Sequence, residues 1–127
     1  MQKLIAILLA IIAVLLAGVG FLNLRTVSAP DLNSQYQAVV LNNGQVFFGK
    51  LENPNAQYPV LRDVFYIVSQ ANPETKQVTN TLVRRGKELH GPEFMIINWQ
   101  SILLIEPVKE DSQVAKFIAE QKKQGSQ

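Results

Sequence analysis

Residues 36–51 read YQAVVLNNGQVFFGKL, in which two runs of β-branched and aromatic residues flank Asn42-Asn43-Gly44. Asn-Gly between such runs is the strongest short-range signal for a β-hairpin, because both residues tolerate a positive φ. Gly49 interrupts the second run, and a glycine inside a strand indicates a bend or a bulge. The stretch therefore predicts an antiparallel hairpin that opens a β domain, with a corner at Gly49.

Further extended runs follow the hairpin and are separated by turn-forming residues. The runs are 60–70, 77–84, 95–98 and 102–105. Their β-branched and aromatic content is typical of strands. Prolines mark the loop 52–59, and glycines with a proline mark the connection 85–93. The sequence therefore predicts one mainly β domain over residues 36–108.

Several of the predicted strands are apolar on both faces. Phe47 and Phe48 are neighbours, so their side chains point to opposite sides of one strand. Phe65 beside Tyr66 and the run 102–105 repeat the pattern. A single-layer barrel buries only its inner face. We therefore expect a second layer over part of the outer face, with the remainder in contact with another subunit.

The segment 109–123 changes from a strand period to a helical one. Asp111 or Ser112 can cap a helix in which Val114, Phe117 and Ile118 fall on one face. We predict an amphipathic helix that either docks on the β domain or packs against a partner, and favour docking. Residues 124–127 are predicted to be a disordered tail.

An uncharged, apolar stretch from Leu4 to Leu24 precedes the β domain. At about 1.5 Å rise per residue, a helix of this length covers the roughly 30 Å of a bilayer core. We predict a transmembrane anchor at 1–25 and a spacer at 26–35. A signal peptide cleaved near Ser28 is the alternative, although the apolar run is long for one. The flanking charges favour a cytoplasmic N-terminus and an extracytoplasmic β domain in the cell membrane.

Small residues in the predicted anchor are spaced alternately by four and three. They are Ala6, Ala10, Ala13, Ala17 and Gly20. This heptad seam suits close helix packing in lipid, which predicts self-association or docking on another membrane helix. Alanine and glycine are also common in membrane helices generally, so this second interpretation stays open.

The basic isoelectric point, about 9.0, suggests nucleic-acid binding only until the charges are placed along the chain. Lys3 and Arg25 flank the anchor, so ten of the twelve basic residues remain to face ten acidic residues in the rest. A formally neutral domain has no field that attracts phosphate backbones, so no nucleic-acid partner is expected. The densest basic cluster, Arg84, Arg85 and Lys87, fits a solvated turn, or lipid headgroups if that turn faces a membrane.

The chain offers little catalytic chemistry. His90 is the only histidine and cysteine is absent. A metal site built from one imidazole and nearby carboxylates is a weak pattern, and no serine has a nucleophile context. We predict no catalytic residue, no metal and no cofactor, and a hydrolase centred on His90 is the least favoured hypothesis. The candidate ligand-binding residues are Arg84, Arg85, Lys87 and His90.

The strand pattern resembles the small SH3-like and Sm-like β-barrels. The resemblance rests on NGQVFFGKL at 43–51, with its glycine-containing bent strand, and on MIIN…ILLI at 95–105. It implies a barrel of five to six strands, and no loop here matches the Sm-like RNA-binding residues. More narrowly, the chain looks like a set of uncharacterised small bacterial single-pass membrane proteins. The matching pieces are 36–39, 43–51, 63–66 and 88–93. That resemblance implies an anchor followed by a β domain, and no activity.

These observations favour a non-enzymatic, membrane-anchored interaction or assembly subunit, as a homo-oligomer or part of a membrane complex. The alternative is a surface module that binds a small ligand, a lipid headgroup or an envelope polymer. Its binding surface would be formed by the loops 52–59 and 84–93.

Overall fold

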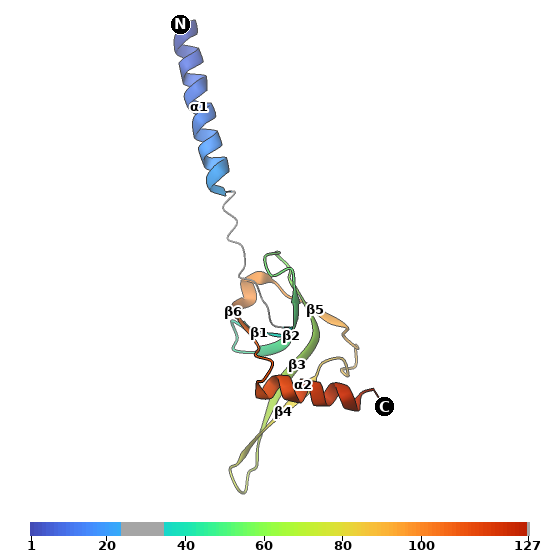
Figure 1. Cartoon of the computed structure of the whole chain (residues 1–127). Helices are drawn as coiled ribbons and strands as arrows, with labels where there is room; N and C mark the ends of the chain where they lie inside the picture. The colour runs from blue at the N-terminus through green and yellow to red at the C-terminus, as the bar shows by residue number, and fades with distance from the viewer. Residues whose placement is uncertain (24–34, 127) are drawn as a thin grey trace.

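A computed structural model describes residues 1–23 and 35–126 of the chain, and Figure 1 shows its arrangement. An N-terminal helix, six strands and a C-terminal helix follow one another. They are α1 (Gln2–Asn23), β1 (Gln37–Leu41), β2 (Val46–Glu52), β3 (Val60–Ala71), β4 (Val78–Arg84), β5 (Phe94–Ile96), a 3₁₀ turn (Trp99–Ser101), β6 (Ile102–Pro107) and α2 (Gln113–Gln124). The predicted spacer lies outside the described residues except for Gln35.

The strands form one antiparallel sheet in the order β4-β3-β2-β1-β6, and β5 pairs with β3. The first residues of β3 pair with β5, whereas its later residues pair with β4. In the part of the chain that the structure describes, no pair joins β6 to β4 or β5. The mainly β architecture predicted from the sequence is confirmed at this level.

The predicted hairpin of residues 36–51 is confirmed, with a different turn. Val39 pairs with Phe47 across β1 and β2. The Gly44 amide donates to the Leu41 carbonyl at 2.9 Å, and Leu41 donates to the Gln45 carbonyl at 2.9 Å. Gly44 alone takes a positive φ in this turn, at 85°. A three-residue loop with glycine in the left-handed position therefore closes the hairpin, in place of a two-residue Asn-Gly turn.

The predicted corner at Gly49 is confirmed as a register shift between β2 and β3. Phe48 pairs with Phe65 and Lys50 pairs with Arg62, so Gly49 faces the two residues between them. A Cβ at Gly49 would lie 2.8 Å from the Arg62 carbonyl oxygen and 2.8 Å from the Leu61 Cγ. Glycine is required here because the two strands approach so closely.

The sheet has an apolar core on each of its faces. The first core contains Val39, Phe47, Leu61, Val64 and Ile97, and the second contains Tyr36, Phe65, Leu82 and Ile118. Phe48 packs against the second core and Tyr66 against the first. Each neighbouring aromatic pair thus divides between the two faces, which confirms the prediction of two-sided strands.

Helix α2 forms the layer over the second core, and the predicted docking within the same chain is confirmed. Ile118 is only 2% exposed between this helix and the sheet. The Gln121 side chain donates to the Leu82 carbonyl at 2.5 Å. Of the two proposed caps, Ser112 is the one used, since its hydroxyl accepts from the Ala115 amide at 3.1 Å. The helix continues through Gln124, which the sequence assigned to the tail.

Helix α1 is long and apolar enough to span a membrane. Its span Gln2–Gly20 contains 19 residues with a mean hydropathy of 2.7. A signal sequence near the N-terminus would also meet these criteria of length and composition. The side chains of residues 1–20 are all exposed.

Replacing Gly49 with Ala tests the close approach at the corner. The added methyl overlaps backbone and side-chain atoms of β3, so we expect the free energy of unfolding to fall by about 1–3 kcal/mol. Urea unfolding of the full chain in detergent micelles measures the change. Gly125→Ala is the matched control, because a Cβ there meets only ordinary contacts at 3.6 Å or more. Equal stability of the two variants would contradict the steric argument.

Candidate functional site

The densest polar arrangement in the β domain surrounds the carboxylate of Asp63. The Tyr36 hydroxyl donates to Asp63 Oδ2 at 2.5 Å, and Arg84 Nη2 donates to Oδ1 at 3.0 Å. Lys122 forms an ion pair with Oδ2. We call these four residues the Asp63 cluster. It joins the start of the domain, β3, β4 and α2 through one side chain.

The register shift at Gly49 places Asp63 in this position. Asp63 is one of the two residues that face Gly49, and its φ is 53°, in the left-handed region. Aspartate tolerates that region better than most residues with a side chain. The side chain is only 14% exposed. The bulge therefore directs a carboxylate toward the layer between sheet and helix, where Tyr36 and Lys122 meet it.

Electrostatics favour the charged forms of Asp63 and Lys122. Burial alone would raise the pKa of Asp63, but hydrogen bonds from Lys122 and Tyr36 and the charges of Lys122 and Arg84 lower that pKa below its ordinary value. Burial and the hydrogen bond to Asp63 raise the pKa of Tyr36. Burial opposes the charge on Lys122, yet its hydrogen bond to Asp63 raises the pKa of the ammonium group.

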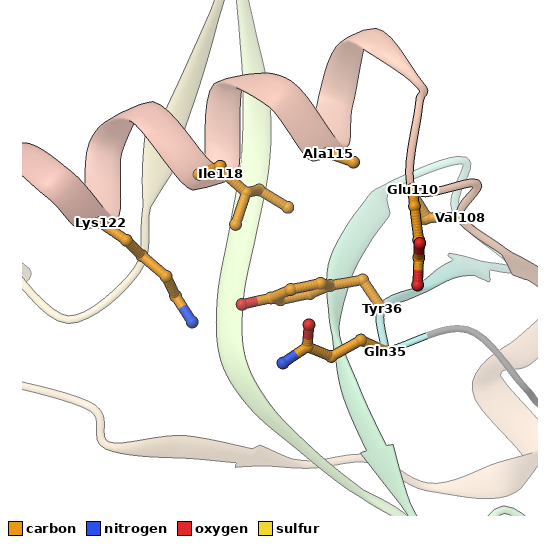
Figure 2. Close-up of a pocket in the computed structure, with 8 residues that line it drawn as sticks. Gln35, Tyr36, Val108, Glu110, Ala115, Ile118 and Lys122 are labelled. Carbon is orange, nitrogen blue, oxygen red and sulfur yellow. The ribbon is translucent and has the colours of Figure 1, made fainter.

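A pocket of about 360 Å³ lies beside the cluster, between α2 and the beginning of β1. Figure 2 shows Ala115, Ile118 and Lys122 of α2 on one side and Tyr36 with Gln35 on the other. Its walls are largely aliphatic, and Glu110 lies at its edge. The Asp63 carboxylate already accepts three interactions, so its evident role is to hold α2 against the sheet.

The four predicted ligand-binding residues do not form one site. Arg84 belongs to the Asp63 cluster. Arg85 is half-buried, with its guanidinium carbon 5.8 Å from the centre of the Phe47 ring. Lys87 and His90 are exposed on the connection 85–93. Arg84 and Arg85 line one pocket, and Lys87 and His90 are not among the residues that line it.

The connection 85–93 has a defined local structure. The carboxylate of Glu88 accepts from the Gly86 amide at 2.8 Å, and its carbonyl accepts from the Gly91 amide at 2.8 Å. The hydrogen bond from the Gly86 amide is the largest of the effects that lower the pKa of Glu88. Leu89 lies between these bonds with its side chain fully exposed. The turn therefore presents an apolar side chain beside His90 and Lys87.

The two loops of the alternative hypothesis line separate pockets. Residues 54–57 of the first loop lie with Trp99 around one of them. Pro92 and Glu93 of the second line another, together with Arg84 and Arg85. The five small residues of the predicted seam lie on one continuous helix and are exposed, as are all of residues 1–20, so the seam stays a prediction.

Sequence reasoning missed Asp63, Tyr36 and Lys122 as a group. The available signal was a lone acidic residue inside the apolar run LRDVFY, on the strand next to the glycine that it faces. Among residues 1–23 and 35–126, no group of three or more histidine, cysteine or acidic side chains is placed to hold a metal ion. No protein-family model matches the chain, and no curated protein matches it.

Replacing Asp63 with Asn tests the electrostatic contribution of the cluster. The folded pKa of Asp63 lies below its unfolded value, so its contribution is present above the ordinary carboxyl pKa of about 4 and is lost as pH falls through the folded pKa. We expect Asp63→Asn to lower the free energy of unfolding by about 1–3 kcal/mol at neutral pH. The difference from the unchanged chain should shrink below pH ~4.

Urea unfolding of the full chain at a series of pH values makes this measurement. Glu120→Gln serves as the control, because Glu120 is an exposed carboxyl on α2, outside the Asp63 cluster. A constant difference between Asp63→Asn and the unchanged chain across the acid range would contradict the assignment.

Proposed function

We propose that this protein is a non-enzymatic, single-pass membrane protein that serves as an interaction or assembly subunit. Its N-terminus is cytoplasmic, and its β domain lies on the outer side of the cell membrane. It acts as a homo-oligomer or as part of a membrane complex. The observation that carries the proposal is α1, an apolar helix on which the side chains of residues 2–20 are all exposed.

The small residues of α1 support association through this helix. Among the described residues, a Cβ at Gly20 would meet no atom within 4 Å. The chain itself therefore gives no packing reason for a glycine there. Ala10 and Ala17 lie on the same seam and are exposed as well. In lipid, such a seam lets a second helix approach closely and gain dispersion contacts.

The β domain supports the proposal because its buried polar groups, those of the Asp63 cluster, serve to hold α2 on the sheet. The buried carboxylate and its cations hold α2 in place. We propose in addition that the domain has the plan of a small SH3-like or Sm-like barrel. The division of β3 between β5 and β4 supports that plan, because a strand shared by two partners curves the sheet. A rigid small domain of this kind suits recognition by its edges and loops.

Exposed apolar side chains on the edge strands provide contact surface. Ile96 on β5 is 64% exposed and Leu103 on β6 is 65% exposed. Trp99, on the 3₁₀ turn between these strands, is 53% exposed. Aromatic and aliphatic side chains of this kind are the usual energetic centre of protein interfaces.

The mass of the full chain in mild detergent tests assembly through α1. We expect an oligomer for the unchanged chain and a shift toward monomer for the double variant Ala10→Leu, Ala17→Leu, because larger side chains hold the helices apart. Val19→Leu on the opposite face is the control and should keep the oligomer. The mass of the single chain in the same measurement shows whether the residues before Ser28 are retained. A cleaved chain, or one with equal mass in all variants, would contradict the proposal.

One observation favours a second candidate function, contact with lipid headgroups. Leu89 is fully exposed at the tip of a hydrogen-bonded turn, next to Lys87 and His90. An apolar side chain close to a lysine suits the interface of an anionic membrane.

A single cysteine placed at residue 89 tests this candidate, since the chain has no other cysteine. We expect a polarity-sensitive dye on Leu89→Cys to shift to the blue in phosphatidylglycerol vesicles and to shift less in phosphatidylcholine vesicles. Adding Lys87→Gln should reduce the difference between the two lipids. Identical spectra in both lipids would remove the candidate.

A further inference from the structure

Strand β3 extends beyond the end of β2, so part of the β3 edge that faces β2 has no partner strand among the described residues. The last pair between β2 and β3 joins Phe47 to Tyr66. Strand β3 continues to Ala71 and pairs there only with β4, as far as the described residues show. The β3–β4 hairpin therefore extends beyond the body of the domain, as Figure 1 shows. One edge of residues 67–71 faces the space that β2 has left.

The hydrogen-bond pattern identifies which backbone groups are free on that edge. Arg85 donates to the Val64 carbonyl and Asn72 donates to the Gln77 carbonyl, both at 2.8 Å. Bonded pairs alternate along an antiparallel ladder, so Tyr66, Val68 and Gln70 direct their amides and carbonyls to β4. The remaining residues of this segment direct theirs away from β4. These residues are Ile67, Ser69 and Ala71. Ile67 lies opposite Val46, the first residue of β2, so among the described residues Ser69 and Ala71 carry the groups that no strand reaches.

A groove of about 470 Å³ lies on this edge. Ile67 and Ser69 line it, whereas Val68 does not, as expected from the alternation. The opposite wall is the β1–β2 turn with Gln45, and the aromatic side chains of β2 form part of the lining. The groove thus has the components that recognise an extended chain: a row of free backbone groups and apolar side chains beside it.

Arg85 provides the charge of this groove. Its side chain lines the groove, and its Nε atom is buried without a hydrogen-bond partner among the described residues. A buried guanidinium nitrogen without a partner is costly unless an acceptor reaches it. A carboxylate matches the guanidinium in charge and geometry.

We propose that this groove binds an extended segment of another polypeptide, which adds as a strand to residues 67–71 and places an acidic group on Arg85. This inference rests on the proposed function and specifies its partner as a peptide segment with a carboxylate. A second copy of this chain fits poorly. If its own residues 67–71 paired in antiparallel register, its Asn72 would fall opposite Tyr66, where Phe47 already lies.

The full chain in lipid nanodiscs and a phage-displayed library of random heptapeptides test the proposal. We expect the enriched peptides to alternate apolar and polar residues and to contain Asp or Glu. Ser69→Pro removes one free amide and keeps the bonds to β4, so it should weaken binding by about tenfold or more. Ser69→Ala is the matched control, because it also removes the hydroxyl that contacts Asn80 but keeps the amide.

A second pair of variants guards against misfolding of Ser69→Pro. Gln45→Trp fills the groove from the opposite wall and should abolish binding. Asn43→Trp adds the same bulk to the turn outside the groove and should not. Arg85→Gln should weaken acidic peptides about tenfold and leave their Asn or Gln analogues unchanged.

Two results would overturn the proposal: no enriched peptide, or peptides that bind Ser69→Pro and Gln45→Trp as well as the unchanged chain. If Ser69→Pro instead lowers the mass of the assembly in detergent, the occupant is a second copy and the proposal is wrong. Failure of assembly through α1 is seen separately in the Ala10 and Ala17 variants, which leave the groove intact.

Discussion

The bulge at Gly49 and Asp63 is the constraint on which the rest of the β domain depends. Gly49 allows β2 and β3 to approach so closely that no side chain fits between them. The extra residue on β3 takes a left-handed conformation, and its carboxylate faces the layer under α2. The same local irregularity thus bends the sheet and supplies the ionic partner that fixes the helix. Removing either half would affect both cores, since each face of the sheet packs around this corner.

A good part of the fold follows from local sequence signals. Local residue patterns were enough to predict four features, because each depends on residues that are neighbours in the sequence. These features are the hairpin, the corner at Gly49, the two-sided strands and the helix capped by Ser112. The turn of the hairpin differs from the simplest expectation because Leu41 and Gln45 close a longer loop.

The polar cluster escaped prediction because its members are far apart in the chain. Tyr36, Asp63 and Lys122 come together only when strand register and helix placement are known. For the predicted basic cluster the reverse holds: its members are close in sequence but have different partners in the fold. Arg84 and Arg85 are neighbours in sequence, but on a strand end they point to different partners, one to Asp63 and the other toward Phe47. Residue spacing alone does not reveal which of two adjacent side chains is already paired.

The proposed function places two kinds of contact on one chain. The seam of α1 suits contact between helices in lipid. The groove beside β3 suits an extended peptide outside the membrane. The Asp63 cluster belongs to neither surface; it holds α2 on the sheet through the ion pair of Lys122 with Asp63.

The most direct test of the central claim is a cysteine scan along α1 in native membranes. The chain has no cysteine, so each single substitution reports one position. Assembly through the seam predicts disulfide cross-linking at Ala6, Ala10, Ala13 and Ala17, and none at Leu8, Leu15 or Val19. Cross-linking without that period, or none at any position, would contradict an assembly held by this helix.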